Sequence, residues 1–272
     1  MADGPGELAA DPFVALMWRY VVEYTNTHDA SVCDEIMDPG YCLHMGGHDV
    51  RGRDDAYKPA VAAQYRQFPY LGIVAHDVVS NGDRLALHFS EHGASNRFDG
   101  NTASWSGIGV YDWDGARLLE NWVEQDYFAR RLQLSSGVPT PLDPPALDPW
   151  VVPAVPADAG TEAAARRWLE EGRLDGEGIV VDDRGHAPGS KQPRIDVTDV
   201  TVDDLFSAGT KFGFHATWRG VYVGGLDGQD DAVGTEVLHY FSGIGTVTGG
   251  IVTARVITDR LGLDKRLSAG AG

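Results

Sequence analysis

Three residues of types that can move protons lie near strand-like segments of the sequence: Asp126, His44 and His88. A carboxylate beside an aromatic wall loses hydration, which raises its pKa toward neutrality and suits it to general acid–base catalysis. Histidine exchanges a proton near pH 7 without a large shift in its pKa. We therefore expect an acid–base centre in which Asp126 and His44 form a catalytic pair, with His88 as a third catalytic residue.

Asp126 ends a strand-like segment in which Trp122, Glu124 and Asp126 alternate onto one face. This alternation predicts that an indole lies beside the carboxylate and that Trp122 and Glu124 contact the substrate. A structural role is the alternative. An aspartate at a strand end can cap a turn or pair with Arg130 or Arg131.

Both histidines also have structural alternatives. His44 ends the strand that follows the second predicted helix, where its ring could instead bond a backbone carbonyl. His88 shares a strand face with Ser90 and His92. If that face points inward, His88 joins the pocket; if it points outward, His88 belongs to an interface between sheets together with His215.

Aromatic residues could complete the site. Tyr20, Tyr24 and Tyr41 could each donate a hydroxyl hydrogen bond to a developing oxyanion. Trp105 is expected to contact the substrate as well. At helical spacing, however, such rings also serve simply as core.

Metal and cofactor machinery is not expected. His44/His48 and His88/His92 are each separated by three residues, but both pairs fall in strand or loop contexts rather than on a helix. The sequence has no glycine-rich phosphate loop, no nucleophile elbow and no CxxC motif. We therefore expect chemistry that needs neither a metal nor a cofactor.

Composition narrows the class of protein. The 272 residues are 43% hydrophobic and 23% charged, which is typical of globular domains. A net charge of −18 without basic clusters argues against nucleic acid and membrane surfaces as partners. No leader or long apolar run is visible, so we expect a cytoplasmic protein in which Cys33 and Cys42 stay reduced.

A proline-rich stretch divides the chain. Residues 135–160 hold seven of the fourteen prolines, which excludes a continuous helix or a central strand. We expect an N-terminal domain at 1–135 with the active pocket, a linker at 136–160, and a reduced domain at 161–272.

The two flanking segments resemble each other. The block Gly82–Gly93 matches Gly209–Gly220 at an offset of 127, and Leu118–Asp126 matches Ile251–Asp259 at an offset of 133. The six extra residues of the second copy fit the turn-like segment 224–231. Two blocks in the same order predict a tandem duplication.

Each copy begins with helices and continues with strands. Helices are expected at 12–25, 31–37 and 54–67, and strands at 77–80, 84–91, 104–112 and 118–127. In the second copy a helix at 162–174 and a strand at 178–182 are expected, and the third helix is missing. This order predicts an α+β fold with helices on one face of a curved antiparallel sheet.

These residues resemble the SnoaL-like branch of the NTF2-like superfamily from about Phe13 to Leu134. The resemblance rests on several short motifs in the expected order: Thr27-His-Asp29, Tyr41-Cys-Leu-His44, Arg51-Gly-Arg-Asp54, Phe68-Pro69, Val79-Ser-Asn-Gly-Asp-Arg-Leu85, Asp114-Gly-Ala-Arg-Leu-Leu-Glu-Asn-Trp122, Trp122-Val-Glu-Gln-Asp126 and Arg131-Leu-Gln-Leu134. The second copy carries only the sheet half and has Arg255 in place of Trp122.

The resemblance implies two cone-shaped domains, the second reduced, with an apolar cavity between helices and sheet. It implies an acid–base aspartate at Asp126 and a cavity-facing His44. It also implies a cyclase, isomerase, dehydratase or lyase acting on a small, largely apolar cyclic or aromatic substrate. The alternative is a module that only binds a small molecule or dimerises, and the sheet faces could support a homo-oligomer.

Overall fold

The structure is a computed structural model that describes residues 11–141, 144–182 and 192–270. Asp11 begins the first helix, because its carboxylate accepts a hydrogen bond from Phe13 N and Pro12 occupies the first turn. The helical segments before the sheet are α1 (Pro12–Trp18), η1 (Arg19–Thr25), α2 (Val32–Ile36), η2 (Arg53–Tyr57) and α3 (Lys58–Gln67). They agree closely with the predicted helices.

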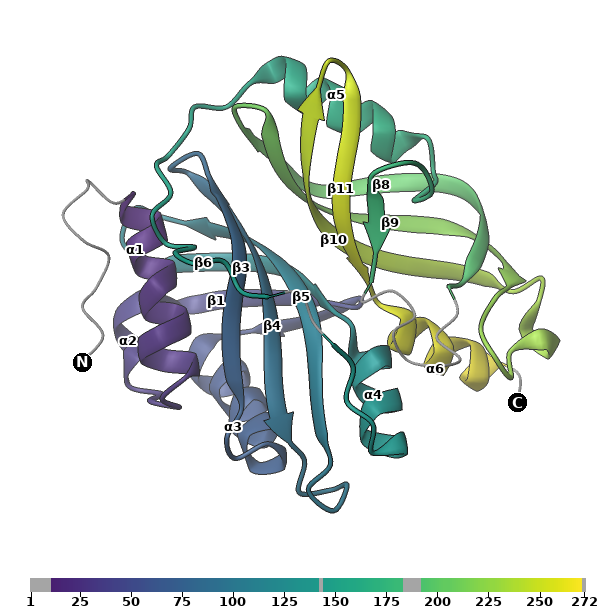
Figure 1. Cartoon of the computed structure of the whole chain (residues 1–272), viewed down its shortest axis with the longest axis horizontal. Coiled ribbons are helices and arrows are strands. Elements are labelled where there is room, and N and C mark those ends of the chain that lie inside the picture. The colour runs from purple at the N-terminus through teal and green to yellow at the C-terminus, as the bar shows by residue number, and fades with distance from the viewer. Residues whose placement is uncertain (1–10, 142–143, 183–191, 271–272) are drawn as a thin grey trace.

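The first half forms a six-stranded sheet in the order β2-β1-β6-β5-β4-β3. Its strands are β1 (Met37–Met45), β2 (His48–Arg51), β3 (Gly72–Ser80), β4 (Arg84–Ala94), β5 (Thr102–Trp113) and β6 (Leu118–Gln125). Helices α1, α2 and α3 cover one face of this sheet (Figure 1). Between them lies the first hydrophobic core, to which Phe13, Leu87 and Phe89 contribute.

The second half forms a five-stranded sheet in the order β7-β11-β10-β9-β8. Its elements are α5 (Ala159–Glu170), β7 (Ile179–Val181), β8 (Arg194–Ala208), β9 (Lys211–Gly224), η3 (Asp230–Ala232), β10 (Glu236–Thr248) and β11 (Ile251–Thr258). Helix α5 covers this sheet and packs Trp168 against Phe212 and Phe214 (Figure 1). The predicted absence of a third helix concerns the interval between the strand at 178–182 and Gly209; residues 183–191 of it lie outside the described residues, and Arg194–Ala208 form β8.

The two halves share strand topology as well as sequence. Strand β1 pairs in parallel with β6, and β7 pairs in parallel with β11. Strands β4 and β9 begin at Arg84 and Lys211, at the expected offset of 127. Each half also ends in a helix that the sequence analysis missed, α4 (Tyr127–Ser136) and α6 (Arg260–Gly270), at the offset of 133. The second sheet thus supports the tandem duplication in part.

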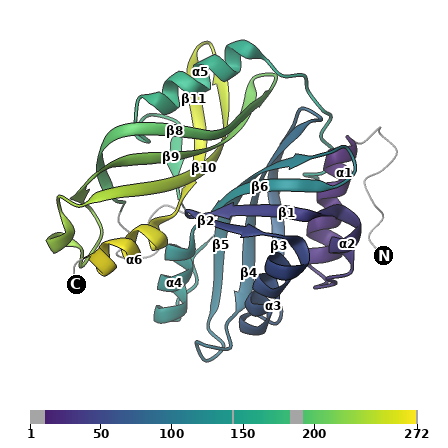
Figure 2. The same ribbon diagram turned by 180° about the vertical axis from the view of Figure 1, so that it is seen from behind.

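The halves pack through the sheet faces that the helices leave uncovered. Val79, Ala86 and Ile108 of the first sheet form one buried cluster with Phe206 and Ile244 of the second. The halves lie against each other along these faces, with α4 and α6 side by side (Figure 2). The faces proposed for a homo-oligomer are therefore covered within one chain, and the division into domains at 1–135 and 161–272 stays a prediction.

No helix among the described residues combines the length and the apolar character needed to cross a bilayer.

Candidate active site

A cavity of about 240 Å³ lies between the helices and the sheet of the first half. Apolar side chains from β1, β2, α3 and β6 form part of its wall, including Leu43, Val50, Val61 and Val123. Six of the chain's ten tyrosines also line it: Tyr20, Tyr24, Tyr57, Tyr65, Tyr111 and Tyr127. The cavity is thus mainly apolar, with phenol hydroxyls as its most frequent polar groups.

Glu91 of β4 is the carboxylate that lines this cavity. It is 6% exposed. Burial raises the pKa of Glu91 from 4.5 to about 7, although the charge of Arg130 and hydrogen bonds from neighbouring side chains oppose the rise. A carboxyl group that titrates near neutrality can both take and return a proton at physiological pH.

Amide side chains hold this carboxyl group in place. Gln64 Nε2, on α3, donates to Glu91 Oε2 at 2.8 Å. Trp105, opposite Glu91 in the β4–β5 register, donates its indole N–H to Gln125 Oε1 at 2.8 Å. Gln125 in turn lowers the pKa of Glu91 through a hydrogen bond. The carboxyl group therefore has a fixed orientation before any ligand arrives.

Arg130 packs against aromatic rings beside the hydrogen-bond network of Glu91. Its guanidinium carbon is 3.9 Å from the centroid of the Tyr127 ring and 5.0 Å from that of Trp105. This cation–π packing keeps the positive charge near Glu91 without a direct ion pair between them among the described residues. Arg130 thus opposes the effect of burial on the pKa of Glu91.

Tyrosine hydroxyls supply neutral donors in the cavity. Tyr20 Oη and Tyr57 Oη lie 3.2 Å apart. Burial raises the pKa of both phenols well above 10, so both stay protonated at neutral pH. Asn121 also lines the cavity, and its Oδ1 has no hydrogen-bond partner among the described residues. The cavity therefore offers neutral hydroxyl donors to an oxyanion.

The placement of Asp126 in this cavity is corrected by the structure. Asp126 is fully buried outside the cavity, where Oδ1 accepts from Ala129 N at 3.0 Å and caps α4. Its Oδ2 accepts from the Arg260 guanidinium of the second half. Capping was the structural alternative for Asp126, but its ion-pair partner is Arg260 rather than Arg130 or Arg131.

His44 also lies outside the cavity. Leu43 and Met45 of β1 line the cavity, so alternation directs His44 to the opposite face. Its ring stacks on Trp122, with centroids 3.8 Å apart, and contacts Asp49 and Glu120. His44 and Asp126 are therefore not brought together as an acid–base pair.

His88 lies on the face of β4 that points away from the cavity, which was the second of its two sequence-based alternatives. It is 6% exposed on the face of β4 that packs toward the second half, where it lines a shallow depression with Asp77 and Arg255. Burial lowers its pKa well below 6.5, so the imidazole is neutral. Its repeat counterpart His215 lies at the same interface and contacts Glu124 Oε1 at 3.2 Å.

The predicted substrate-contacting residues divide into three groups. Tyr20 and Tyr24 line the cavity. Tyr41 and Trp105 are buried behind its wall, Tyr41 against the Tyr57 ring. Trp122 and Glu124 share one face, as alternation predicted, but that face meets the second half: Glu124 N donates to Ser242 Oγ at 3.1 Å.

Glu91 was visible in the sequence as an anomaly. Alternation along β4 groups Glu91 with Leu87 and Phe89, opposite the face of His88. A charged residue on an otherwise apolar strand face is the signal of a functional carboxylate. The sequence instead indicated His88 on the opposite, polar face of β4 as the candidate, although that face packs against the second half.

The two helix-covered sheets, one of six strands and one of five, give the chain an α+β fold. Residues 18–121 match the family model described as a SnoaL-like domain. This part of the first half is thus similar to a SnoaL-like domain, in line with the resemblance seen in the sequence. A search of curated proteins returned no match.

Several solved structures are similar to parts of this chain. A candidate SnoaL-like polyketide cyclase from Jannaschia sp. CCS1 is 18% identical, covers 49% of this chain and 99% of its own, and has a TM-score of 0.42. TsrD from Streptomyces laurentii is 20% identical over 48% and 99%, with a TM-score of 0.42. IdmH from Streptomyces antibioticus, a candidate polyketide cyclase, is 20% identical over 46% and 98%, with a TM-score of 0.40.

Proposed function

We propose that the protein is a cofactor-independent enzyme that transfers protons on a small, largely apolar cyclic or aromatic substrate in the N-terminal cavity. Glu91 is the acid–base group, in place of Asp126 and the histidines. The observation that carries this proposal is the enclosed Glu91 carboxyl group, whose pKa burial raises to about 7 among neutral phenols. Cyclase, isomerase, dehydratase and lyase reactions all need such a group.

The cavity limits the size of the substrate and suggests how it reacts. About 240 Å³ is less than the roughly 300–1,000 Å³ that drug-sized ligands occupy, so a molecule of one or two rings fits best. The Glu91 carboxylate removes a proton next to a carbonyl, and the Tyr20–Tyr57 hydroxyl pair donates hydrogen bonds to the resulting enolate oxygen. The protonated carboxyl group then returns the proton elsewhere on the ring.

A module that only binds or dimerises is the alternative function. Such a module needs an apolar or filled cavity, whereas titratable Glu91 and the fixed amide of Gln64 converge on this one. This convergence favours the enzyme. The tandem arrangement and the ion pairs between the halves serve the fold under either function.

The pH dependence of a probe reaction tests the proposal. Nitrobenzisoxazole opens when a base removes its ring C–H proton: the N–O bond breaks and a coloured phenolate forms. Because Glu91 must be ionised to act as the base, kcat/KM is expected to rise about tenfold per pH unit below pH 7 and to level off above it. A rate that shows no inflection between pH 5 and 9, after subtraction of the buffer reaction, contradicts the assignment.

Arg130 is expected to set the midpoint of that profile. Replacing it in Arg130→Met removes a positive charge that lowers the pKa of Glu91, so the inflection moves to higher pH, by roughly one unit. Arg131→Met is the matched control, since Arg131 follows it on α4 but pairs with Asp264 at 2.7 Å. An unmoved inflection in Arg130→Met would mean that another group is titrating.

A further inference from the structure

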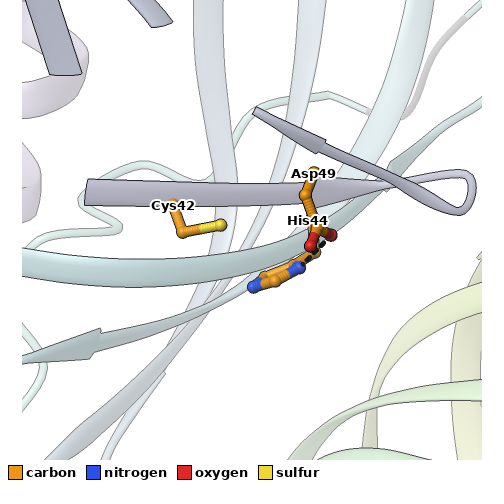
Figure 3. Close-up of side chains that lie close together, drawn as sticks. All are labelled: Cys42, His44 and Asp49. Atoms are coloured by element: carbon orange, nitrogen blue, oxygen red, sulfur yellow. Dashed lines mark hydrogen bonds and ion pairs between the residues drawn. The ribbon is translucent and has the colours of Figure 1, made fainter. Parts of the chain in front are cut away.

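A second group of reactive side chains lies on the opposite face of β1, outside the cavity. Cys42, His44 and Asp49 each present a ligand atom, and these atoms lie within 4.8 Å of one another. The three side chains come from β1 and β2, and the Cys42 sulfur points toward the imidazole (Figure 3). The proposed proton-transfer chemistry uses none of them.

Strand register explains why the three meet. Cys42 and His44 are two residues apart on β1 and so share a face. The antiparallel β1–β2 hairpin sets Asp49 directly opposite His44. His44 Nδ1 lies 2.7 Å from Asp49 Oδ1. The cluster is therefore fixed by the hairpin rather than by flexible loops.

The imidazole is held from two further sides. Its Nε2 lies 2.6 Å from Glu120 Oε1 on β6. Trp122, also on β6, stacks on the ring at an interplanar angle of 12°. When a histidine binds a metal through one ring nitrogen, the other nitrogen usually donates to a carboxylate that fixes its orientation. Glu120 occupies that position and leaves Nδ1 directed at Asp49.

The geometry points to a Zn²⁺ site formed by Cys42 Sγ, His44 Nδ1 and an Asp49 carboxylate oxygen, with Glu120 as the orienting carboxylate. Thiolate, imidazole and carboxylate together are a ligand set typical of zinc, whereas harder cations prefer oxygen alone. The Asp49 side chain is 57% exposed, so the ion has access from solvent and water completes the tetrahedron.

Metal binding requires both Asp49 and Cys42 to adjust their side chains. The metal takes the place of the hydrogen bond between His44 and Asp49, and the Cys42 thiol releases its proton to solvent. Ligands bonded to zinc at 2.0–2.1 Å lie about 3.3 Å apart in a tetrahedron, so the exposed Asp49 carboxylate moves outward by about 0.6 Å from His44. Cys42 Sγ, now within 4.8 Å of the other two ligand atoms, has to lie about 3.6 Å from them, given a Zn–S bond of about 2.3 Å. Neighbouring Val50 of the same hairpin lines the cavity, so the ion would also anchor part of the cavity wall.

Cobalt spectroscopy of the reduced full-length chain tests the site. We expect one equivalent of Co²⁺ to produce the near-ultraviolet band of a metal–thiolate bond, and Zn²⁺ to displace it. The band should vanish in Cys42→Ser and persist in Cys33→Ser, because Cys33 is buried in the first core away from the hairpin. In Glu120→Gln, competition with a chromogenic chelator should show Zn²⁺ affinity reduced by about 10–100-fold.

Two results would overturn the inference. One is a wild-type chain that binds no Co²⁺ or gives no thiolate band, and the other is an identical band in Cys42→Ser. Unfolding scans guard against a folding defect: added Zn²⁺ should raise the Tm of wild type and Cys33→Ser but leave that of Cys42→Ser unchanged.

Discussion

Replacing Glu91 by glutamine is expected to lower kcat/KM for the nitrobenzisoxazole by at least about 100-fold at pH 8. Glutamine has nearly the same shape and can still accept the hydrogen bond from Gln64 Nε2. It has no basic carboxylate, so proton removal from carbon falls to water or buffer. The measurement is the initial rate of phenolate formation at several pH values, in which the inflection near pH 7 should disappear.

The same substitution is expected to stabilise the fold, which separates a functional role from a structural one. Because burial raises the folded-state pKa of Glu91 from 4.5 to about 7, the folded chain favours the protonated form. The stability that this proton provides is complete below pH 4.5 and is lost as pH rises through 7. At pH 8 the penalty is about 3 kcal/mol, so Glu91→Gln should gain up to that amount in urea unfolding.

Glu124→Gln is the matched control for this experiment. Glu124 is another buried carboxylate of the first sheet, but it faces the second half and bonds to Gly46 N and His215. Its replacement should leave the probe rate within a few-fold of wild type. Equal rate losses in both variants would indicate a general disturbance of the sheet, and an unaffected Glu91→Gln would end the proposed role of Glu91.

Most helices and the central strands of the first sheet could be predicted from the sequence because local patterns determine them, whereas β2 and β8 have no counterpart among the predicted strands. Asp11-Pro12 signals the start of α1, and the glycine-bounded β4 and β9 blocks revealed the repeat. The terminal helices were missed because Tyr127 directly follows the strand pattern of β6. Helix α4 begins at the N-cap formed by Asp126. Whether an aspartate serves as an N-cap depends on where the chain leaves the strand.

The site was harder to predict because a strand has two faces and the sequence does not say which one meets the cavity. In β1 and β6 the sequence analysis directs the face with His44 or Asp126 to the cavity, and in β4 it leaves both faces open, because a single cone has its outer face in solvent. In this chain the outer face meets a second sheet. His215 and Glu124 pair there, so polar residues at the interface resembled catalytic ones.

The packing of the two sheets against each other accounts for this inversion. An isolated cone can direct its polar groups to water, but a fused pair must satisfy them across a buried interface. Ser242 Oγ does this twice, donating to Ile108 O at 2.6 Å and accepting from Glu124 N. Acid–base residue types therefore gather where the halves meet, while the cavity retains one carboxylate and its tyrosines.

Asp126→Asn is expected to destabilise the chain rather than impair proton transfer. Arg260 is 1% exposed and lies between Asp126 and Asp182, whose nearest oxygen is 3.1 Å from Arg260 Nε. Asparagine keeps the cap on α4 but removes one of the two charges that compensate the buried guanidinium. Breaking a buried pair costs about 3 kcal/mol or more, which corresponds to a fall in Tm of roughly 6–12 °C.

The repeat supplies the matched control, Asp259→Asn. Asp259 caps α6 through Gly262 N at 2.8 Å, as Asp126 caps α4, but its partner Arg266 is 37% exposed. Solvent can stabilise the positive charge of Arg266, so the free energy of unfolding should fall by only about 1 kcal/mol. If Asp126→Asn instead kept the wild-type Tm and lost probe turnover 100-fold, Asp126 would belong to the chemistry and the role given to Glu91 would be wrong. We therefore expect a larger fall in Tm for Asp126→Asn than for Asp259→Asn, with turnover preserved in both variants. The reason is that the buried Arg260 guanidinium needs two carboxylates.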